Sequence, residues 1–546
     1  MITKKILVTF ILFASIVFAN AQSSHVVDAT AVNKQLILED EVPQNWFHLD
    51  PQADHYKGVS DQKAYEQILK AKKTKTVIVA IIDSGIDIEH EDLKDNIWIN
   101  TDEIAGNGID DDKNGYVDDV YGWNFIGGAD GKMVNQENLE LTRLYVKYKK
   151  IYEGKSASDF KGKKLKEFNQ YLEYKKAFEA KVQEAKQTLQ NIEGFAKMLT
   201  LADSTMKAEL AKDDYTIEDL QNFQSDKQNV NQAKGMLIYA KTNGITLEDM
   251  QEGVDYYKEQ LEYNLNPDFD ARHIVGDDYD NKKQRDYGNN KVEGPDAMHG
   301  THVAGIIGAI RNNNLGMNGI AADVKIMVIR CVPNGDERDK DVANSIYYAV
   351  NNGAQIINMS FGKAYSPYKK YVDKAVKYAE KKGVLLIHAA GNDGQNNDEL
   401  PNFPNARYLN GKVAKNWIEV GASSWQNEGN FVAPFSNYGK NSVDVFAPGM
   451  KIYSTVPDNK YKNLQGTSMA SPVVAGVAAL VLSYYPDLSA LQLKDVLLKS
   501  VENYGDAEVI LPGTRDKKTQ FKNLSQTGGI INAYKALKLA EELSKK

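Results

Sequence analysis

The sequence has very little cysteine, since Cys331 is its only one. A lone cysteine excludes an internal disulfide framework and a cluster of thiolate metal ligands. It ends an apolar run over residues 324–332, where a small buried hydrophobe is the simplest interpretation. A surplus of positive charge is also missing, because 66 Lys and Arg face 74 Asp and Glu, for a net charge of −8. The charge therefore gives no basis for binding nucleic acid.

Long apolar runs that could span a membrane are missing too. Lys4 and Lys5 precede a short apolar run over residues 6–18, which is followed by Ala-Asn-Ala at 19–21. A positive start, a short apolar core and a small-x-small site are typical of a secretory signal peptide, here with cleavage after Ala21. The alternative is an uncleaved N-terminal anchor, for which the run is short. We predict a secreted or periplasmic mature chain without stable membrane insertion.

Glycine and proline nearly vanish between about residues 135 and 270, where Lys, Glu, Gln, Leu, Ala and Tyr dominate. Helix starts of the Thr-x-x-Asp type occur at Thr216 and Thr246. We predict an all-α insertion over residues 135–275, packed as a helical hairpin or small bundle. Its role is open between a structural face and a lid or partner-docking module. An apolar seam at heptad spacing is formed by Phe178, Val182, Ala185, Leu189 and Ile192.

On both sides of this insertion, strand patterns alternate with helix patterns. The alternation predicts an α/β fold with a doubly wound, mostly parallel sheet, formed by residues 56–134 and 276–546. Residues 22–55 form an N-terminal extension or a short pro-segment in this interpretation. The predicted strands are 75–82, 324–332, 355–359, 384–389 and 418–422, and the predicted helices are 341–351, 368–382, 489–500 and 533–543.

Polar residues follow three of the predicted strands. Asp83 comes directly after the first strand, and an acid at the carboxyl end of a buried parallel strand lies where open α/β sheets build their sites. An ordinary Asp-Gly turn is the alternative. Residues 360–362 (Ser-Phe-Gly) and 389–392 (Ala-Ala-Gly-Asn) close two other strands. We expect all three segments at one edge of the sheet.

Two further motifs precede apolar helix patterns. His299 begins a small-residue pattern, and His302 three positions later leaves a metal pair as an alternative, although no third ligand is near. Ser468 lies in Gly-Thr-Ser-Met-Ala-Ser-Pro at 466–472, at a predicted helix N-terminus where unpaired N–H groups favour negative charge. A plain helix cap is the alternative for this serine. Pro472 is expected in the first helical turn.

Asp83, His299 and Ser468 together provide an acid, a base and a nucleophile. Hydrolysis of an acyl group needs this set: the imidazole takes the serine proton, and the aspartate holds and stabilises the imidazole. The oxyanion that forms needs fixed donors. The side-chain amide of Asn392 and the backbone N–H of Ser468 are the candidates.

These motifs resemble the subtilisin-like serine peptidases, or subtilases, in kind and in chain order, over residues 75–133 and 290–540. The resemblance implies a secreted serine endopeptidase that acts on polypeptides through an acyl-enzyme, with Asn392 as oxyanion donor. A catalytically impaired scaffold that binds a partner through the insertion is the alternative. The resemblance also implies a substrate-lining edge of Ser360, Phe361 and Gly362, and a pocket base of Ala390 and Gly391. This base suits an apolar or aromatic side chain, while Asp393 beside it leaves a basic one open.

Hard oxygen donors gather in the acidic stretch over residues 107–119. Their alternation around Gly115 resembles the first half of a calcium loop, but Tyr121 stands at the twelfth position, so the stretch is no EF-hand. A solvated acidic turn is the alternative. The family resemblance adds Asp92 as a calcium ligand beside the loop at 312–314. The predicted ligands of structural calcium are Asp92, Asp110, Asp112, Asn114, Tyr116, Asp118 and Asp119.

Overall fold

The computed structural model describes residues 42–69, 72–426 and 429–545. The predicted signal peptide and the first part of the N-terminal extension lie outside these residues. The chain forms two compact units: one comprises residues 141–269, and the other the described parts of 38–140 and 270–546.

The larger unit is built on a nine-stranded sheet in the order β10-β13-β7-β6-β5-β4-β1-β3-β2. The pair β10–β13 is antiparallel, and every other neighbouring pair in this sheet is parallel. The predicted fold class, an α/β fold with a mostly parallel sheet, is therefore confirmed. The strands are β1 (Val77–Asp83), β2 (Gly122–Asn124), β3 (Val324–Arg330), β4 (Ile356–Met359), β5 (Leu385–Ala389), β6 (Trp417–Ser423), β7 (Val445–Pro448), β10 (Glu502–Asn503) and β13 (Gly529–Ile530).

The centre of this sheet explains its apolar strand sequences. β1 pairs with β3 from Val77↔Val324 to Asp83↔Arg330, and with β4 on its other side. Almost every residue of these strands is buried, because helices cover both faces of the sheet. The five predicted strands all correspond to observed ones.

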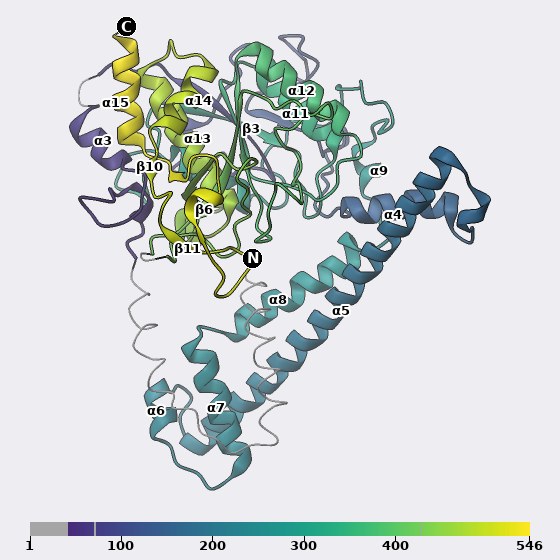
Figure 1. Ribbon diagram of the computed structural model, residues 1–546, viewed down its shortest axis with the longest axis vertical. Helices are drawn as coiled ribbons and strands as arrows, with labels where there is room; N and C mark the ends of the chain where they lie inside the picture. Colours follow the sequence, from purple (N-terminus) through teal and green to yellow (C-terminus); the bar gives the residue numbers. More distant parts are fainter. Residues whose placement is uncertain (1–41, 70–71, 427–428, 546) are drawn as a thin grey trace. The chain divides into compact units, whose positions relative to one another are not determined.

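Helices cover both faces of the sheet (Figure 1). α10 and α13 pack against each other and against β1, and α13 also crosses β4 to β7, whereas α11 packs against α12, β1 and β3. The four predicted helices of this part are confirmed with small shifts at their ends. The bounds are α3 (Asp61–Gln67), α9 (Arg272–Val275), α10 (Met298–Gly308), α11 (Asp339–Asn351), α12 (Lys369–Lys382), α13 (Thr467–Tyr484), α14 (Ala490–Lys499) and α15 (Ala533–Ser544).

α13 is long and apolar enough to cross a membrane by length and composition, which the sequence analysis did not foresee. Of its residues 89% are buried inside the larger unit, where it is the central core helix. The remaining short elements of this unit are η1 (Trp46–His48), η2 (Lys94–Asn96), η5 (Phe521–Asn523), the hairpin of β8 (Ile452–Val456) with β9 (Lys460–Leu464), and the pair of β11 (Glu508–Ile510) with β12 (Lys518–Gln520).

The smaller unit is helical. Its main element is α5 (Gly162–Leu210), a single helix of 49 residues, against which α7 (Gln228–Thr242) and α8 (Leu247–Glu259) pack. The predicted heptad seam lies on α5, with Phe178, Ala185 and Ile192 buried. The predicted starts at Thr216 and Thr246 are confirmed, because both form capping boxes. The other elements are α4 (Glu140–Tyr152), η3 (Ala157–Asp159), α6 (Ile217–Asn222) and the π-helix η4 (Gln260–Asn264).

Candidate active site

The residues predicted to form a site lie at the carboxyl edge of the sheet. Asp83 is the last residue of β1, and Ser360 and Asn392 follow β4 and β5. His299 and Ser468 are each the second residue of a helix, α10 and α13. Parallel strands end at one edge, and the helices that return to that edge bring their N-terminal turns to the same place.

Asp83 and His299 form a direct pair. Asp83 is 2% exposed, and its Oδ1 lies 2.7 Å from His299 Nδ1 while also accepting the N–H of Ser84 at 2.7 Å. Burial by itself would lower the pKa of His299, but the charge and hydrogen bond of Asp83 outweigh it and raise that pKa above 6.5. The contact through Nδ1 leaves Nε2 as the nitrogen that could exchange a proton with another group.

His302 does not join His299 in a metal pair. It is fully buried, and its Nε2 lies 3.0 Å from the carbonyl oxygens of both Ile452 and Lys462. Burial lowers the pKa of His302 to about 3, so the ring is neutral at physiological pH. This histidine fastens α10 to the β8–β9 hairpin.

Ser468 is held against the end of β4 by two reciprocal bonds. Its hydroxyl donates to the carbonyl of Ser360 at 3.0 Å, and the hydroxyl of Ser360 donates to the carbonyl of Ser468 at 2.9 Å. The expected place of Pro472 in the first helical turn is wrong, because Pro472 is the sixth residue of α13. A residue there would normally donate its N–H to the Ser468 carbonyl. Proline lacks that N–H, and the carbonyl is thereby available to Ser360.

Asn392 is oriented by the residue that precedes Ser468. Its Oδ1 accepts the backbone N–H of Thr467 at 2.9 Å and the Thr467 hydroxyl at 3.0 Å. The Nδ2 end of the amide therefore points away from Thr467. The backbone N–H of Ser468 belongs to the first turn of α13, where no intrahelical acceptor exists. Two candidate N–H donors, the Asn392 amide and the Ser468 backbone, are thus associated with the first turn of α13.

The expected substrate-lining residues adjoin this group. Gly391 donates its N–H to the Thr467 hydroxyl at 3.1 Å, which joins the segment of Ala390 and Gly391 to α13. Phe361 is mostly buried, with 9% of its surface exposed. A side chain at Gly362 would meet the amide of Asn402, at 2.4 Å from Nδ2.

Two asparagines that the sequence analysis missed shape this loop. Asn437 is fully buried; its Nδ2 donates to the carbonyl of Ala390 at 3.0 Å, and its Oδ1 accepts the N–H groups of Asp393 and Gln395. Asn402 donates to the same Ala390 carbonyl at 3.3 Å. Both act over long sequence separations, and no local pattern marks them.

The acidic loop gathers only part of its predicted metal ligands. Asp112 and Asp119 lie with Glu103, and one carboxylate oxygen of each is within 4.8 Å of the others. The amides of Asn100 and Asn114 donate to both aspartates. Burial raises the pKa of Asp119 to about 6. Glu103 and Asn100 were missed because they precede the acidic stretch.

The other predicted ligands of this loop do not join the carboxylate group. Asp110 accepts the backbone N–H groups of Asn114 and Gly115, and Asp118 accepts those of Asn107 and Gly108. Both carboxylates therefore shape the turns of the loop. The aromatic ring of Tyr116 is buried and packs edge-on against Trp123, Phe125 and Tyr348.

Asp92 lies apart from that loop. It is fully buried, accepts the Nδ2 of Asn313 at 2.7 Å and the hydroxyl of Tyr461 at 3.2 Å, and adjoins the N–H of Met317 at 3.5 Å. Burial raises its pKa. The predicted proximity of Asp92 to the polar loop at 312–314 is thus observed.

Comparison with known proteins relates this chain to a family of peptidases. Residues 74–522 match the model of the subtilase family. A stretch of 264 residues is 37% identical to the thermophilic serine proteinase of Bacillus sp. strain AK1, covering 48% of this chain and 58% of the relative. The chain therefore matches little more than half the length of that relative.

Other relatives are matched over more of their length. Subtilisin DY of Bacillus licheniformis is 40% identical over 213 residues, covering 38% of this chain and 72% of the relative. Thermitase of Thermoactinomyces vulgaris is 39% identical over 240 residues, covering 44% and 74%. A solved structure described as proteases from Pseudoalteromonas arctica is 27% identical, with a TM-score of 0.37, and covers 47% of this chain and 80% of its own.

Proposed function

Because the chain belongs to the subtilase family of serine peptidases, we propose that it is a serine endopeptidase that cleaves polypeptides through an acyl-enzyme. The observations that support this proposal lie at one edge of the sheet: the Asp83–His299 pair at the end of β1, and the bonds that join Ser360 and Asn392, after β4 and β5, to the N-terminal turn of α13 with Ser468. Loss of labelling by a fluorophosphonate after replacement of Ser468 tests it, as set out in the Discussion.

In this proposal the serine hydroxyl turns from the Ser360 carbonyl to His299 Nε2. His299 takes the proton while the Ser468 oxygen attacks the peptide carbonyl, and Asp83 stabilises the imidazolium. The Asn392 amide and the Ser468 N–H receive the oxyanion. His299 then gives the proton to the leaving amine, and water repeats the sequence to release the acid. The positive end of α13 favours both oxyanions.

The proposed general base predicts how activity depends on pH. Proton transfer from Ser468 needs a neutral His299, and the pKa of His299 is raised above 6.5 because of Asp83. Activity should therefore be present above that pKa and should fall tenfold per pH unit below it. A profile of kcat/KM with an uncharged substrate should show an acid limb with an apparent pKa above 6.5. A maximum near pH 4 would contradict His299 as the base.

We also propose structural calcium at the group of Glu103, Asp112 and Asp119. Three converging carboxylates with amide neighbours are the hard oxygen donors that calcium prefers, and without a cation their charges repel one another. Asp92 with the amide of Asn313 is a second candidate pair. Calcium bound there would act on stability, since these residues are separate from the proposed catalytic group.

Removal of calcium should lower the melting temperature. At a calcium concentration about a hundred times its dissociation constant, binding stabilises by about 2.7 kcal/mol, so EDTA should lower the melting temperature of this large unit by about 3 °C. A variant with Glu103→Gln and Asp112→Asn should lose most of this response. Asp130→Asn, which alters an exposed carboxylate paired with Lys132, is the control and should keep it. An unchanged melting temperature in EDTA would contradict a stabilising site.

The proposal extends to location and to the helical insertion. The signal-peptide pattern at residues 1–21 supports export, and a mature protein found inside the cell would contradict it. The insertion over residues 135–275 is proposed as a lid or interaction module that limits which substrates reach Ser468. A folded variant without it that cleaves the same proteins at the same rates would exclude that role.

A further inference from the structure

The sheet order locates a slot for an extended peptide beside Ser468. β1 lies between β4 and β3 and ends at Asp83. The chains of its two neighbours continue beyond that point as residues 360–363 and 331–337. Adjacent strands are about 4.8 Å apart, so the missing continuation of β1 leaves room for one strand between the two segments.

The backbone of 331–337 presents alternate residues to this slot. Asn334 and Asp336 direct their backbone groups outward, where they bond to residues 135–138 at 2.8 to 3.3 Å. Because extended chain alternates its N–H and C=O directions, the groups of Gly335 and Glu337 face the slot. Within the described part of the chain, the backbone of Gly335 has no hydrogen-bond partner.

On the opposite side of the slot, the backbone of residues 360–363 also presents alternate residues to it. Lys363 exchanges both of its backbone bonds with Phe403 at 2.9 Å, on the outer side. Because backbone directions alternate along an extended chain, the N–H and C=O groups of Gly362 face the slot, and so do those of Ser360. The carbonyl of Ser360 indeed accepts the hydroxyl of Ser468 at 3.0 Å. The backbone of Gly362 is likewise without a partner among the residues described.

The side chain of Lys363 crosses this slot. Its Nζ donates to the slot-facing carbonyl of Glu337 at 2.7 Å, and it forms ion pairs with Glu140 at 3.0 Å and Asp339 at 2.9 Å. The ammonium thus has three acceptors for its three protons. The side chain is 1% exposed. A buried ammonium paired with two carboxylates is costly to displace, so an incoming peptide would not move it.

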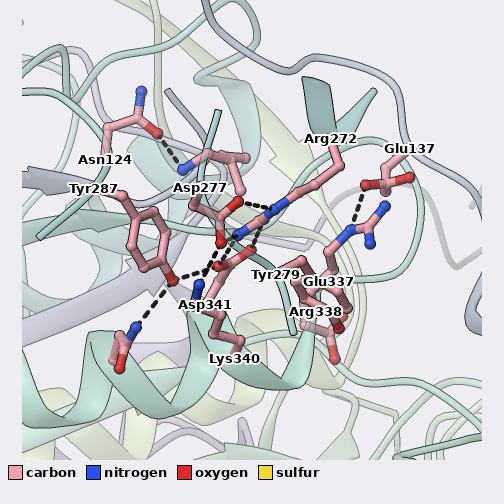
Figure 2. Close-up of polar contacts among 12 residues, drawn as sticks. Asn124, Glu137, Arg272, Asp277, Tyr279, Tyr287, Glu337, Arg338, Lys340 and Asp341 are labelled. Atoms are coloured by element: carbon pink, nitrogen blue, oxygen red, sulfur yellow. Dashed lines mark hydrogen bonds and ion pairs between the residues drawn. The ribbon is translucent and has the colours of Figure 1, made fainter. Parts of the chain in front are cut away.

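The turn that receives Lys363 is itself anchored, as Figure 2 shows. Arg338 pairs with Glu137 at 2.7 Å. Lys340 pairs with Asp277, and Asp341 accepts two bonds from Arg272 at 2.6 and 2.9 Å. Residues 337–341 are therefore tied down by ion pairs on several sides, which makes the closed end of the slot rigid.

We propose that Lys363 is a specificity-determining residue that ends the peptide slot. Ser360 and Lys363 are three residues apart, or about 10 Å along an extended chain. The slot therefore holds three peptide residues on the side of the scissile bond that leads toward Lys363, and a fourth gains no contact inside it. This inference rests on the proposed peptidase function.

The native protein tests the length of the slot. Two series of peptides with a common scissile bond are compared by kcat/KM. One series has one to five residues on the N-terminal side of that bond, and the other has one to five on the C-terminal side. We expect kcat/KM to rise up to the third residue and to change less than twofold with the fourth, whichever residue it is. A rise of tenfold or more on adding a fourth apolar residue would overturn the proposal.

A variant tests Lys363 itself. Lys363→Met with Glu140→Gln removes one charge of each sign and opens apolar space at the end of the slot. A fourth Leu should then raise kcat/KM about tenfold over a fourth Gly, the size of effect that one or two methylenes have in a pocket. An unchanged profile in a folded variant would overturn the role of Lys363.

The control is Lys494→Met with Asp444→Asn, an ion pair of 3.3 Å between α14 and the residue that precedes β7, outside the slot. It should keep the native profile even if its stability falls. The length series needs no variant, so it decides the proposal should the Lys363 variant fail to fold. A native protein that cleaves no peptide at all would instead overturn the proposed function, which separates the two failures.

Discussion

The variant Ser468→Ala is expected to lose labelling by a fluorophosphonate and to lose peptide cleavage. The probe bonds to the serine oxygen, and alanine has no oxygen to offer. Loss of a triad nucleophile lowers kcat by about 10⁶, a magnitude known from peptidases of this same family. Gel fluorescence after labelling, together with kcat/KM on a peptide, measures both effects.

The fold should survive this substitution. The Ser468 hydroxyl makes one bond, to the Ser360 carbonyl, while the reciprocal bond from Ser360 to the Ser468 backbone remains. Ser483→Ala is the matched control, because this buried serine of α13 donates only to the Leu480 carbonyl. It should keep labelling. Full labelling of Ser468→Ala would assign the nucleophile elsewhere, and a native protein that never labels would favour the partner-binding scaffold.

The sequence predicts the sheet and its reactive edge because both depend on local patterns. A strand covered on two faces has a nearly continuous apolar sequence, as in β1 up to Asp83 and in β3 apart from Lys325 and Arg330. Parallel topology then brings the residue after each run to one edge, so Asp83, Ser360 and Asn392 could be placed together before any coordinates. The residues that mark the reactive edge lie in the short loops that directly follow the strands, where a local sequence pattern identifies them.

Residues that act through distant partners could not be predicted in this way. Lys363 forms an ion pair with Glu140, which is 223 positions away in the sequence. In its own segment, each of the two residues would be predicted as an exposed surface charge. Asn437 was missed for the same reason, since it contacts Ala390 across 47 positions. Pro472 was misplaced because α13 begins at Thr467, which puts the proline in the second helical turn. The Ser468 carbonyl, which Pro472 cannot bond, accepts the Ser360 hydroxyl instead, and a tertiary contact of this kind leaves no local pattern.

The extent of α5 was also missed, although its seam was found. Heptad spacing marks which side chains are buried but not where a helix is interrupted. The sequence analysis predicted several helices over residues 135–275, which are observed, but it did not predict that 49 consecutive residues form one of them. Its partners α7 and α8 supply the apolar surface that stabilises so long a helix.

The variant Asn392→Ala is expected to lower kcat by about 10² to 10³ with little change in KM. That range comes from the equivalent donor in a peptidase of this family. The Asn392 amide would meet negative charge only once the peptide carbonyl has become an oxyanion, so its loss weakens the transition state more than the bound substrate. Steady-state kinetics on one peptide separate kcat from KM.

A second substitution isolates the donor from the loop that it stabilises. Asn392→Asp keeps an oxygen for the Thr467 N–H and hydroxyl but has no amide N–H, and its charge repels the oxyanion. It should therefore lose at least as much kcat as alanine while preserving the contact with α13. Asn416→Ala, which removes a buried amide bonded to Val384, controls for stability and should keep kcat. If either Asn392 variant raised KM alone, the amide would belong to substrate binding, and the Ser468 N–H would be left as the chief oxyanion donor.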